Sequence, residues 1–211
     1  MFKDRKDAGK RLAEALDNYK DSDILVLAIP RGGVEVGYEV AKYLNADFDI
    51  IVTRKLPYPT NPEAGFGAIA EDGSFYINES ASKWLTNDEI RRIKQEQNIE
   101  IKRRVAALRQ NRPLPGIKDR NVILIDDGIA MGSTMRASIM LCKNKMAKKI
   151  IVAVPVSGKD TADDIRNMVD EIVILETPSF FQAVAQVYDN WHDVNDDEVL
   201  DIMDKWESFR H

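Results

Sequence analysis

Two adjacent carboxylates, Asp126 and Asp127, follow the apolar run 122–125 and precede a short stretch of small and hydroxylic residues. An apolar run of this kind is typical of a strand buried on both faces, and parallel sheets bind ligands where their strands end. The stretch 128–134 opens a predicted helix, whose free N–H groups and hydroxyls suit a phosphate. Two carboxylates would repel a phosphate bound directly to them, so we expect them to accept hydrogen bonds from hydroxyls elsewhere on the ligand. Segment 126–134 therefore predicts a sugar-phosphate site.

A second candidate anion site follows the first strongly apolar run, residues 24–28. Arg31, Gly32 and Gly33 lie between that run and a helical pattern. Glycines let the backbone approach an anion closely, and arginine offers a planar fork of donors that matches phosphate oxygens. Taken alone, the segment is more typical of an ordinary strand-to-helix turn.

A basic pair, Arg54 and Lys55, stands at the end of the second predicted strand. Prolines and glycines recur through the following residues and fit poorly inside regular elements. We therefore expect a flexible segment over about 54–80, with a loop first and then a hairpin that pairs 67–70 with 74–77. The basic pair could neutralise an anionic ligand, although a solvated pair is an equally good interpretation.

Residues 122–134 resemble the signature with which type I phosphoribosyltransferases bind 5-phosphoribosyl-1-diphosphate (PRPP). The family pattern is four hydrophobic residues, two acids, a few small residues, then a hydroxylic residue, glycine, a small residue and Thr or Ser. Only Met131 departs from it, because the family usually has Thr or Ser there. The resemblance extends over nearly the whole chain, to a subgroup of predicted phosphoribosyltransferases of unassigned acceptor. The segments that carry it are Arg54-Lys55-Leu56, Asn61-Pro62-Glu63, 67–73 and Val154-Pro155-Val156.

The resemblance implies transfer of a 5-phosphoribosyl group from PRPP to a small-molecule acceptor such as a nitrogenous base, with release of pyrophosphate. It implies that Asp126 and Asp127 are catalytic and hold the ribose, and that a cis peptide bond joins Pro30 to Arg31. It further implies Mg²⁺ held mainly through PRPP and a loop that closes over the ligand. The PRPP-binding residues would be Arg31, Gly32, Gly33, Arg54, Lys55, Asp126, Asp127, Gly128, Ile129, Ala130, Met131, Gly132, Ser133 and Thr134.

The acceptor itself is not specified. Ala130 stands where the 6-oxopurine enzymes of the family commonly place a carboxylate against the purine, which disfavours hypoxanthine or guanine. Met131 and the missing carboxylate also fit a regulatory protein that binds PRPP without turnover. A hydrolase with Asp126 or Asp127 as its nucleophile is a third, more distant alternative.

Apolar runs alternate with helical patterns along the chain, which is typical of βαβ units. We expect an α/β fold like that of type I phosphoribosyltransferases: a central, mostly parallel sheet flanked by helices, with a small hood lobe and a flexible loop. Residues 1–211 would form a single domain, and about 176–211 would contribute to the hood. We expect the C-terminal aromatic residues to pack on a helix, with base stacking as the alternative. They are Phe180, Phe181, Tyr188 and Trp191.

Composition and net charge disfavour several other classes of protein. The 211 residues carry a net charge of −5, which disfavours a general nucleic-acid binder. The longest apolar runs have seven residues, too few for a bilayer span, and no secretory signal is recognisable. Neither the single cysteine, Cys142, nor the pair His192 and His211 has the spacing of a metal site. We expect a cytoplasmic protein, and the family resemblance makes a homodimer possible.

Overall fold

The computed structural model describes residues 1–210, and its centre is a five-stranded sheet in the order β2-β1-β6-β7-β8. Every neighbouring pair of strands runs parallel, which confirms the expected sheet. The carboxyl ends of β1 and β6 lie side by side, with Ala28 opposite Ile125. The strands are β1 (Ile24–Ala28), β2 (Asp47–Ile50), β6 (Asn121–Ile125), β7 (Lys149–Val156) and β8 (Glu171–Glu176).

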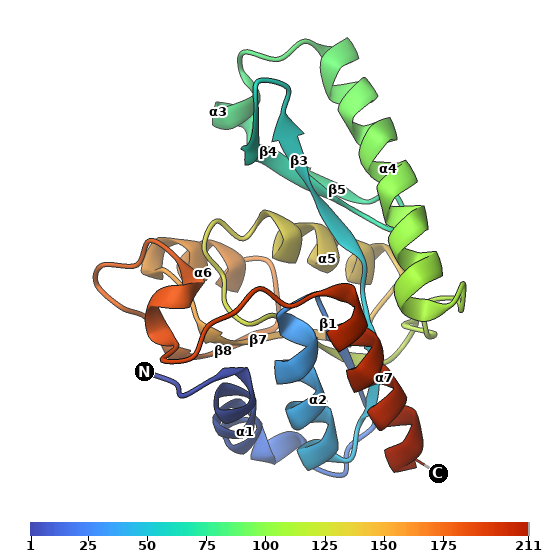
Figure 1. The fold of residues 1–211 in the computed structure, drawn as a ribbon, viewed down its shortest axis with the longest axis vertical. Coiled ribbons are helices and arrows are strands. Elements are labelled where there is room, and N and C mark those ends of the chain that lie inside the picture. The colour runs from blue at the N-terminus through green and yellow to red at the C-terminus, as the bar shows by residue number, and fades with distance from the viewer. Residues whose placement is uncertain (211) are drawn as a thin grey trace.

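Helices cover both faces of this sheet, because its strands are apolar on both sides (Figure 1). Along β1, Val26 and Ala28 pack in one cluster with α1, α2 and α7, whereas Leu25 and Leu27 pack in another with α5 and α6. Among residues 1–210, no helix combines the length and the apolar character needed to cross a membrane. The helices are α1 (Arg5–Ala15), α2 (Gly33–Leu44), α5 (Ser133–Asn144), α6 (Lys159–Arg166) and α7 (Asp196–Arg210).

A separate three-stranded antiparallel sheet forms a small lobe together with α3 and α4 (Figure 1). The long helix α4 packs against β3 and β4, and α5 of the main sheet contacts β4 and β5. Helix α4 begins at a capping box, in which Thr86 and Glu89 exchange hydrogen bonds with each other's backbone N–H. The elements are β3 (Thr53–Tyr58), β4 (Asn61–Ala70), β5 (Phe75–Ile77), α3 (Glu79–Ser82) and α4 (Asn87–Arg109).

The segment expected to begin as a loop at residue 54 is instead a β-hairpin, formed by β3 and β4. Pro57 is tolerated because β3 is an edge strand and the pairing register shifts on both sides of this residue, and Pro59 lies in the turn between the two strands. The predicted second hairpin is confirmed by the pairing of Gly67 with Ile77 across β4 and β5. Movement of the β3–β4 hairpin over a ligand stays a prediction.

The C-terminal aromatic residues lie outside the α-helices, and most of them pack against α1. Between β8 and α7 the chain has one short 3₁₀ turn, η2 (Val184–Val187). Tyr188 and Phe181 share an apolar cluster with Ala8 of α1, and the Trp191 ring lies 3.9 Å from the guanidinium carbon of Arg5. Phe180 is the exception, because its side chain is 92% exposed. A hood built from residues 176–211 stays a prediction.

A buried ion pair ties the small lobe to the main sheet. Glu71, just after β4, accepts hydrogen bonds from Arg109 at the end of α4, and Arg109 Nη1 also donates to the carbonyl of Ile50 at 3.1 Å. The Arg109 side chain is 1% exposed, and the Glu71 carboxylate also accepts a hydrogen bond from the N–H of Val52 at 2.9 Å. One pair thus fixes the turn of the small sheet, the end of α4 and the chain after β2.

We expect Glu71→Gln to lower the free energy of unfolding by about 3–5 kcal/mol, because it leaves a buried guanidinium without its counter-charge. Urea denaturation measures this change. Glu96→Gln is the matched control, since Glu96 pairs with Arg92 on the surface and such pairs contribute less than about 1 kcal/mol. Equal losses in the two variants would contradict a joining role for Glu71.

Candidate functional site

Two side chains hold the loop between β6 and α5 by hydrogen bonds to its backbone carbonyls. The backbone N–H groups of the same loop remain free. Thr161 Oγ1 donates to the carbonyl of Ala130 at 2.9 Å, and Arg136 Nη1 donates to that of Met131 at 2.7 Å. Within the described chain, no hydrogen bond uses the N–H groups of residues 130–134. Gly132 adopts a left-handed conformation, φ 73°, which turns the loop into the helix. The loop therefore presents a row of unpaired donors, the arrangement that binds a phosphate.

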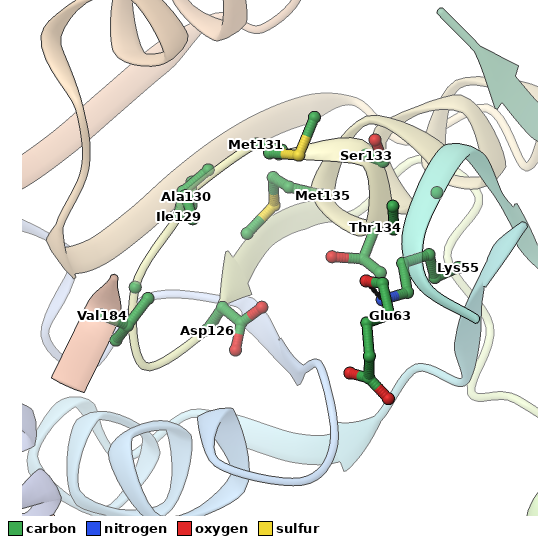
Figure 2. A pocket seen from close by; sticks show the side chains of 14 residues that line it. Lys55, Glu63, Asp126, Ile129, Ala130, Met131, Ser133, Thr134, Met135 and Val184 are labelled. Atoms are coloured by element: carbon green, nitrogen blue, oxygen red, sulfur yellow. Dashed lines mark hydrogen bonds between the residues drawn. The ribbon is translucent and has the colours of Figure 1, made fainter. Parts of the chain in front are cut away.

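A cavity of about 300 Å³ lies between this loop and the β3–β4 hairpin (Figure 2). Lys55 and Glu63 of the hairpin face the loop across it, and the Lys55 ammonium donates to the carbonyl of Glu63. The cavity lining thus contains a cation and a carboxylate from the hairpin, and the Asp126 carboxylate from the opposite wall. Its lining consists of Lys55, Glu63, Ala64, Gly65, Asp126, Gly128, Ile129, Ala130, Met131, Gly132, Ser133, Thr134, Met135 and Val184.

The two aspartates have different surroundings. Asp126 is half-buried, lines the cavity and points into it, while its Oδ1 accepts the N–H of Asp127 at 2.9 Å (Figure 2). Asp127 is buried beside the cavity, and its Oδ2 accepts a hydrogen bond from Arg5 Nε at 2.8 Å. Burial and the charge of Asp127 raise the pKa of Asp126 well above its ordinary value. Burial also raises the pKa of Asp127, and the charge of Arg5 opposes that rise.

The segment Arg31, Gly32 and Gly33 lies directly against these aspartates. A Cβ on Gly32 would lie 2.6 Å from Asp127 Cγ, and one on Gly33 would lie 2.8 Å from Asp126 Cα. Both contacts are closer than atoms tolerate, so only glycine fits at either position. The peptide bond between Pro30 and Arg31 is cis, as the family resemblance implies. The structure thus brings together the two segments in which the sequence predicted anion binding.

Two predicted arginines point away from the cavity. Arg31 Nη1 lies 3.7 Å from Asp196 Oδ1 at the start of α7, and its side chain is 41% exposed. Arg54 Nε donates to Gln97 Oε1 of α4 at 3.2 Å. Neither these two residues nor Gly32, Gly33 and Asp127 are among the residues that line the cavity. Met131, the departure from the family pattern, lines the cavity but is 66% exposed.

Sequence reasoning missed three features of the site. Val184 forms an apolar wall beside Asp126, and nothing in its neighbours marks it as a site residue. Glu63 carries a charge that the sequence left without a role. Arg5, which contacts Asp127, looks like one more charge in a solvated first helical turn. The sequence held no signal for Arg5, because its partner lies far away along the chain.

No cluster of three or more His, Cys, Asp or Glu side chains suited to a metal ion occurs in residues 1–210; His211 lies outside the described residues. Cys142 is buried in the core, where desolvation raises the pKa of its thiol to about 12. Mg²⁺ prefers phosphate oxygens, water and few carboxylates, so an open cavity with one aspartate and many N–H donors suits a Mg²⁺–phosphate complex rather than a free ion.

Comparison with known proteins agrees with this arrangement. Residues 2–190 match the model of the phosphoribosyl transferase domain. The chain is 38% identical over 207 residues to a Mycobacterium tuberculosis protein provisionally named a phosphoribosyl transferase. That match covers 97% of this chain and 47% of the relative, so the chain spans about half the length of that protein.

Two solved structures share the fold. The protein TT1426 from Thermus thermophilus is 34% identical, with a TM-score of 0.82 over 97% of this chain and 98% of that chain. The purine phosphoribosyltransferase from Pyrococcus horikoshii is 17% identical, with a TM-score of 0.50 over 90% of this chain and 93% of that chain, a likeness of fold alone. The parallel sheet, the glycine turn against two aspartates and the domain match together show that this chain belongs to the phosphoribosyl transferase family, with the type I fold.

Proposed function

We propose that the protein transfers a 5-phosphoribosyl group from PRPP to a nitrogenous base and releases pyrophosphate. The observation that carries this proposal is a single cavity in which the free N–H groups of residues 130–134 stand beside the Asp126 carboxylate. A sugar phosphate needs both features, because the N–H groups bind its phosphate and the carboxylate accepts hydrogen bonds from its hydroxyls. Membership of the family supports the same ligand.

In the proposed reaction, the bond between the anomeric carbon of ribose and the pyrophosphate oxygen breaks, and a bond from that carbon to an acceptor nitrogen forms. The electron pair of the broken bond leaves with pyrophosphate, and the acceptor nitrogen loses its proton. Positive charge develops on the ribose in the transition state. Asp126 stabilises that charge because its carboxylate already points into the cavity and needs no reorganisation as the charge develops. No covalent intermediate on the protein is required.

The pyrophosphate end of PRPP would lie against the turn of Arg31, Gly32 and Gly33. Arg31 is half-exposed and loosely paired with Asp196, so its guanidinium can exchange that partner for a phosphate oxygen. Lys55 adds a second cation from the hairpin. Mg²⁺ enters as the counter-ion of PRPP and offsets the charge of the departing pyrophosphate.

The acceptor would lie against the apolar wall formed by Val184 and Gly128. This wall is next to Asp126 and is the part of the cavity that the phosphate donors leave free. A flat, largely apolar ring suits such a wall, because no carboxylate stands at position 130 to select a 6-oxopurine edge. We therefore expect adenine, uracil or another base that needs no such carboxylate to react faster than guanine.

The experiment incubates the protein with Mg²⁺, PRPP and a panel of purine and pyrimidine bases, and measures release of pyrophosphate. Release that depends on one base supports the transferase. Tight PRPP binding by calorimetry without turnover on a broad panel favours the regulatory protein instead, which the exposed Met131 makes a serious second candidate. Failure of PRPP to bind would contradict both.

Met131→Thr restores the hydroxyl that the family usually has in this loop. We expect PRPP affinity to stay unchanged or to rise by up to about tenfold, the effect of one added hydrogen bond to a charged group. Calorimetry with Mg²⁺ and PRPP measures it, and Met140→Thr on the outer face of α5 is the control. A marked loss of affinity at position 131 alone would mean that this loop does not bind the phosphate.

A further inference from the structure

Arg5 is a buried cation at the start of α1. Arg5 is only 3% exposed, although charged side chains in the first turn of a surface helix are usually solvated. A buried charge is stable only when it is paired and its donors are satisfied. The partners of Arg5 therefore indicate why the chain keeps it there.

Two segments remote from each other in sequence hold this guanidinium. Arg5 Nε donates to Asp127 Oδ2 at 2.8 Å, and Nη1 donates to the carbonyl of His192 at 2.9 Å. The guanidinium carbon lies 3.9 Å from the centre of the Trp191 ring, over its face. Tyr188 donates its hydroxyl to the carbonyl of Asp127 at 2.6 Å. Asp127 is thus held at its carboxylate by α1 and at its backbone by the segment before α7.

This arrangement also touches the glycine turn. A Cβ on Gly32 would lie 2.9 Å from Arg5 Nε, so the guanidinium and the Asp127 carboxylate together form the surface on which that turn rests. The two aspartates are also linked directly, because Asp126 Oδ1 accepts the backbone N–H of Asp127 at 2.9 Å. Arg5 therefore contacts both segments that we propose to bind PRPP, without lining the cavity itself.

Few other charges face the two aspartates. Glu35 of α2 lies near Arg5 and is half-buried, so burial raises the pKa of its carboxyl. His192 Nε2 is paired with Glu198 at 2.8 Å on the surface. Across the cavity stand Lys55 and Glu63, which contribute opposite charges. The titratable groups around the aspartates are therefore Arg5, Glu35 and Tyr188, with Lys55 and Glu63 across the cavity, and among them Arg5 is the cation in direct contact.

We propose that Arg5 is a positioning residue for the reaction: it fixes Asp127 beneath Gly32 and keeps the aspartate pair ionised, so that Asp126 presents a negative charge to the ribose. This inference rests on the proposed function. It gives α1 a role in the reaction, although α1 belongs to neither of the two segments in which the sequence predicted anion binding.

The test is Arg5→Gln, with kcat and PRPP affinity measured from pH 6 to pH 9. Removal of a contacting cation makes both carboxylates hold their protons more tightly, so the acid limb of the pH profile moves upward by about one unit or more. At pH 7 we expect kcat to fall about tenfold or more and to recover largely by pH 9. A merely structural role predicts an equal loss at every pH, and that result would overturn the proposal.

Arg5→Lys keeps the proposal testable if the glutamine variant does not fold. Lysine retains the charge but cannot reach Asp127 and His192 with one planar group. We expect its acid limb to stay near that of the wild type while kcat falls several-fold and KM for PRPP changes little. An unchanged kcat would overturn the positioning role. Arg11→Gln is the control, since Arg11 lies on the same helix and is 44% exposed, with no contact to Asp127.

Failure of the proposed function and failure of the proposed role of Arg5 give different results. If PRPP does not bind to the wild-type protein, the proposed function fails. If PRPP binds and turns over but Arg5→Gln keeps the wild-type pH profile, only the role of Arg5 fails.

Discussion

Gly32→Ala is expected to lower PRPP affinity by roughly tenfold to a hundredfold, because the added methyl group overlaps the Asp127 carboxylate and lies 2.9 Å from Arg5 Nε. The backbone conformation of Gly32, φ −60° and ψ −33°, suits alanine equally well. The effect is therefore purely steric and acts on the turn that we propose to hold pyrophosphate. Calorimetry with Mg²⁺ and PRPP measures the affinity, and urea denaturation measures the free energy of unfolding.

The control for this substitution is Gly116→Ala. A Cβ at Gly116 meets no atom within 4 Å, so neither PRPP affinity nor stability should change. A second variant, Gly33→Ala, places its methyl group 2.8 Å from Asp126 Cα and should behave like Gly32→Ala. Normal PRPP affinity in both turn variants would mean that pyrophosphate binds elsewhere.

Asp126→Asn is expected to abolish most turnover while it makes the protein more stable at neutral pH. The activity falls by about 10²–10³, the usual cost of removing one group that stabilises transition-state charge. Stability rises because the raised pKa of Asp126 shows that its charged form is disfavoured in the folded state. Asparagine keeps the oxygen that accepts the N–H of Asp127 and removes the disfavoured charge.

Proton linkage determines how the stability difference between Asp126→Asn and the wild type changes with pH. The folded protein holds the Asp126 proton more tightly than the unfolded chain, so its carboxylate reduces stability as pH rises through the interval between the two pKa values. The difference between Asp126→Asn and the wild type should be full above the folded-state pKa and vanish toward about pH 4, the ordinary aspartate range. Thermal unfolding from pH 4 to pH 8 measures this. A variant less stable than the wild type at pH 8 would contradict the account.

Local patterns predicted much of the fold and the loop between β6 and α5. The run 122–125, the acids after it and the helix start at Ser133 are contiguous, so one segment of sequence holds both the strand and the donors that follow it. The capping box at Thr86 and Glu89 is equally local. In such segments the residues that determine the structure are near neighbours along the chain.

Local patterns were less informative where long-range packing determines the structure. Arg54 has the residue type of a phosphate ligand, and here it donates to Gln97 of α4, which packs against β3; its part in PRPP binding stays a prediction. The proline-rich residues after it form a hairpin because β4 supplies a partner strand, which the proline content alone argues against. Arg5 and Val184 reach the site from the two ends of the chain, so no local pattern could mark them.

The central claim is that residues 126–134 and Arg31 to Gly33 bind the two ends of one PRPP molecule. A crystal structure of the protein with Mg²⁺ and PRPP tests it most directly. We predict the 5′-phosphate on the N–H groups of residues 130–134, the ribose hydroxyls at Asp126, and the pyrophosphate against Gly32 with Arg31 turned away from Asp196. PRPP bound at any other place, or with its phosphate remote from this loop, would contradict the account.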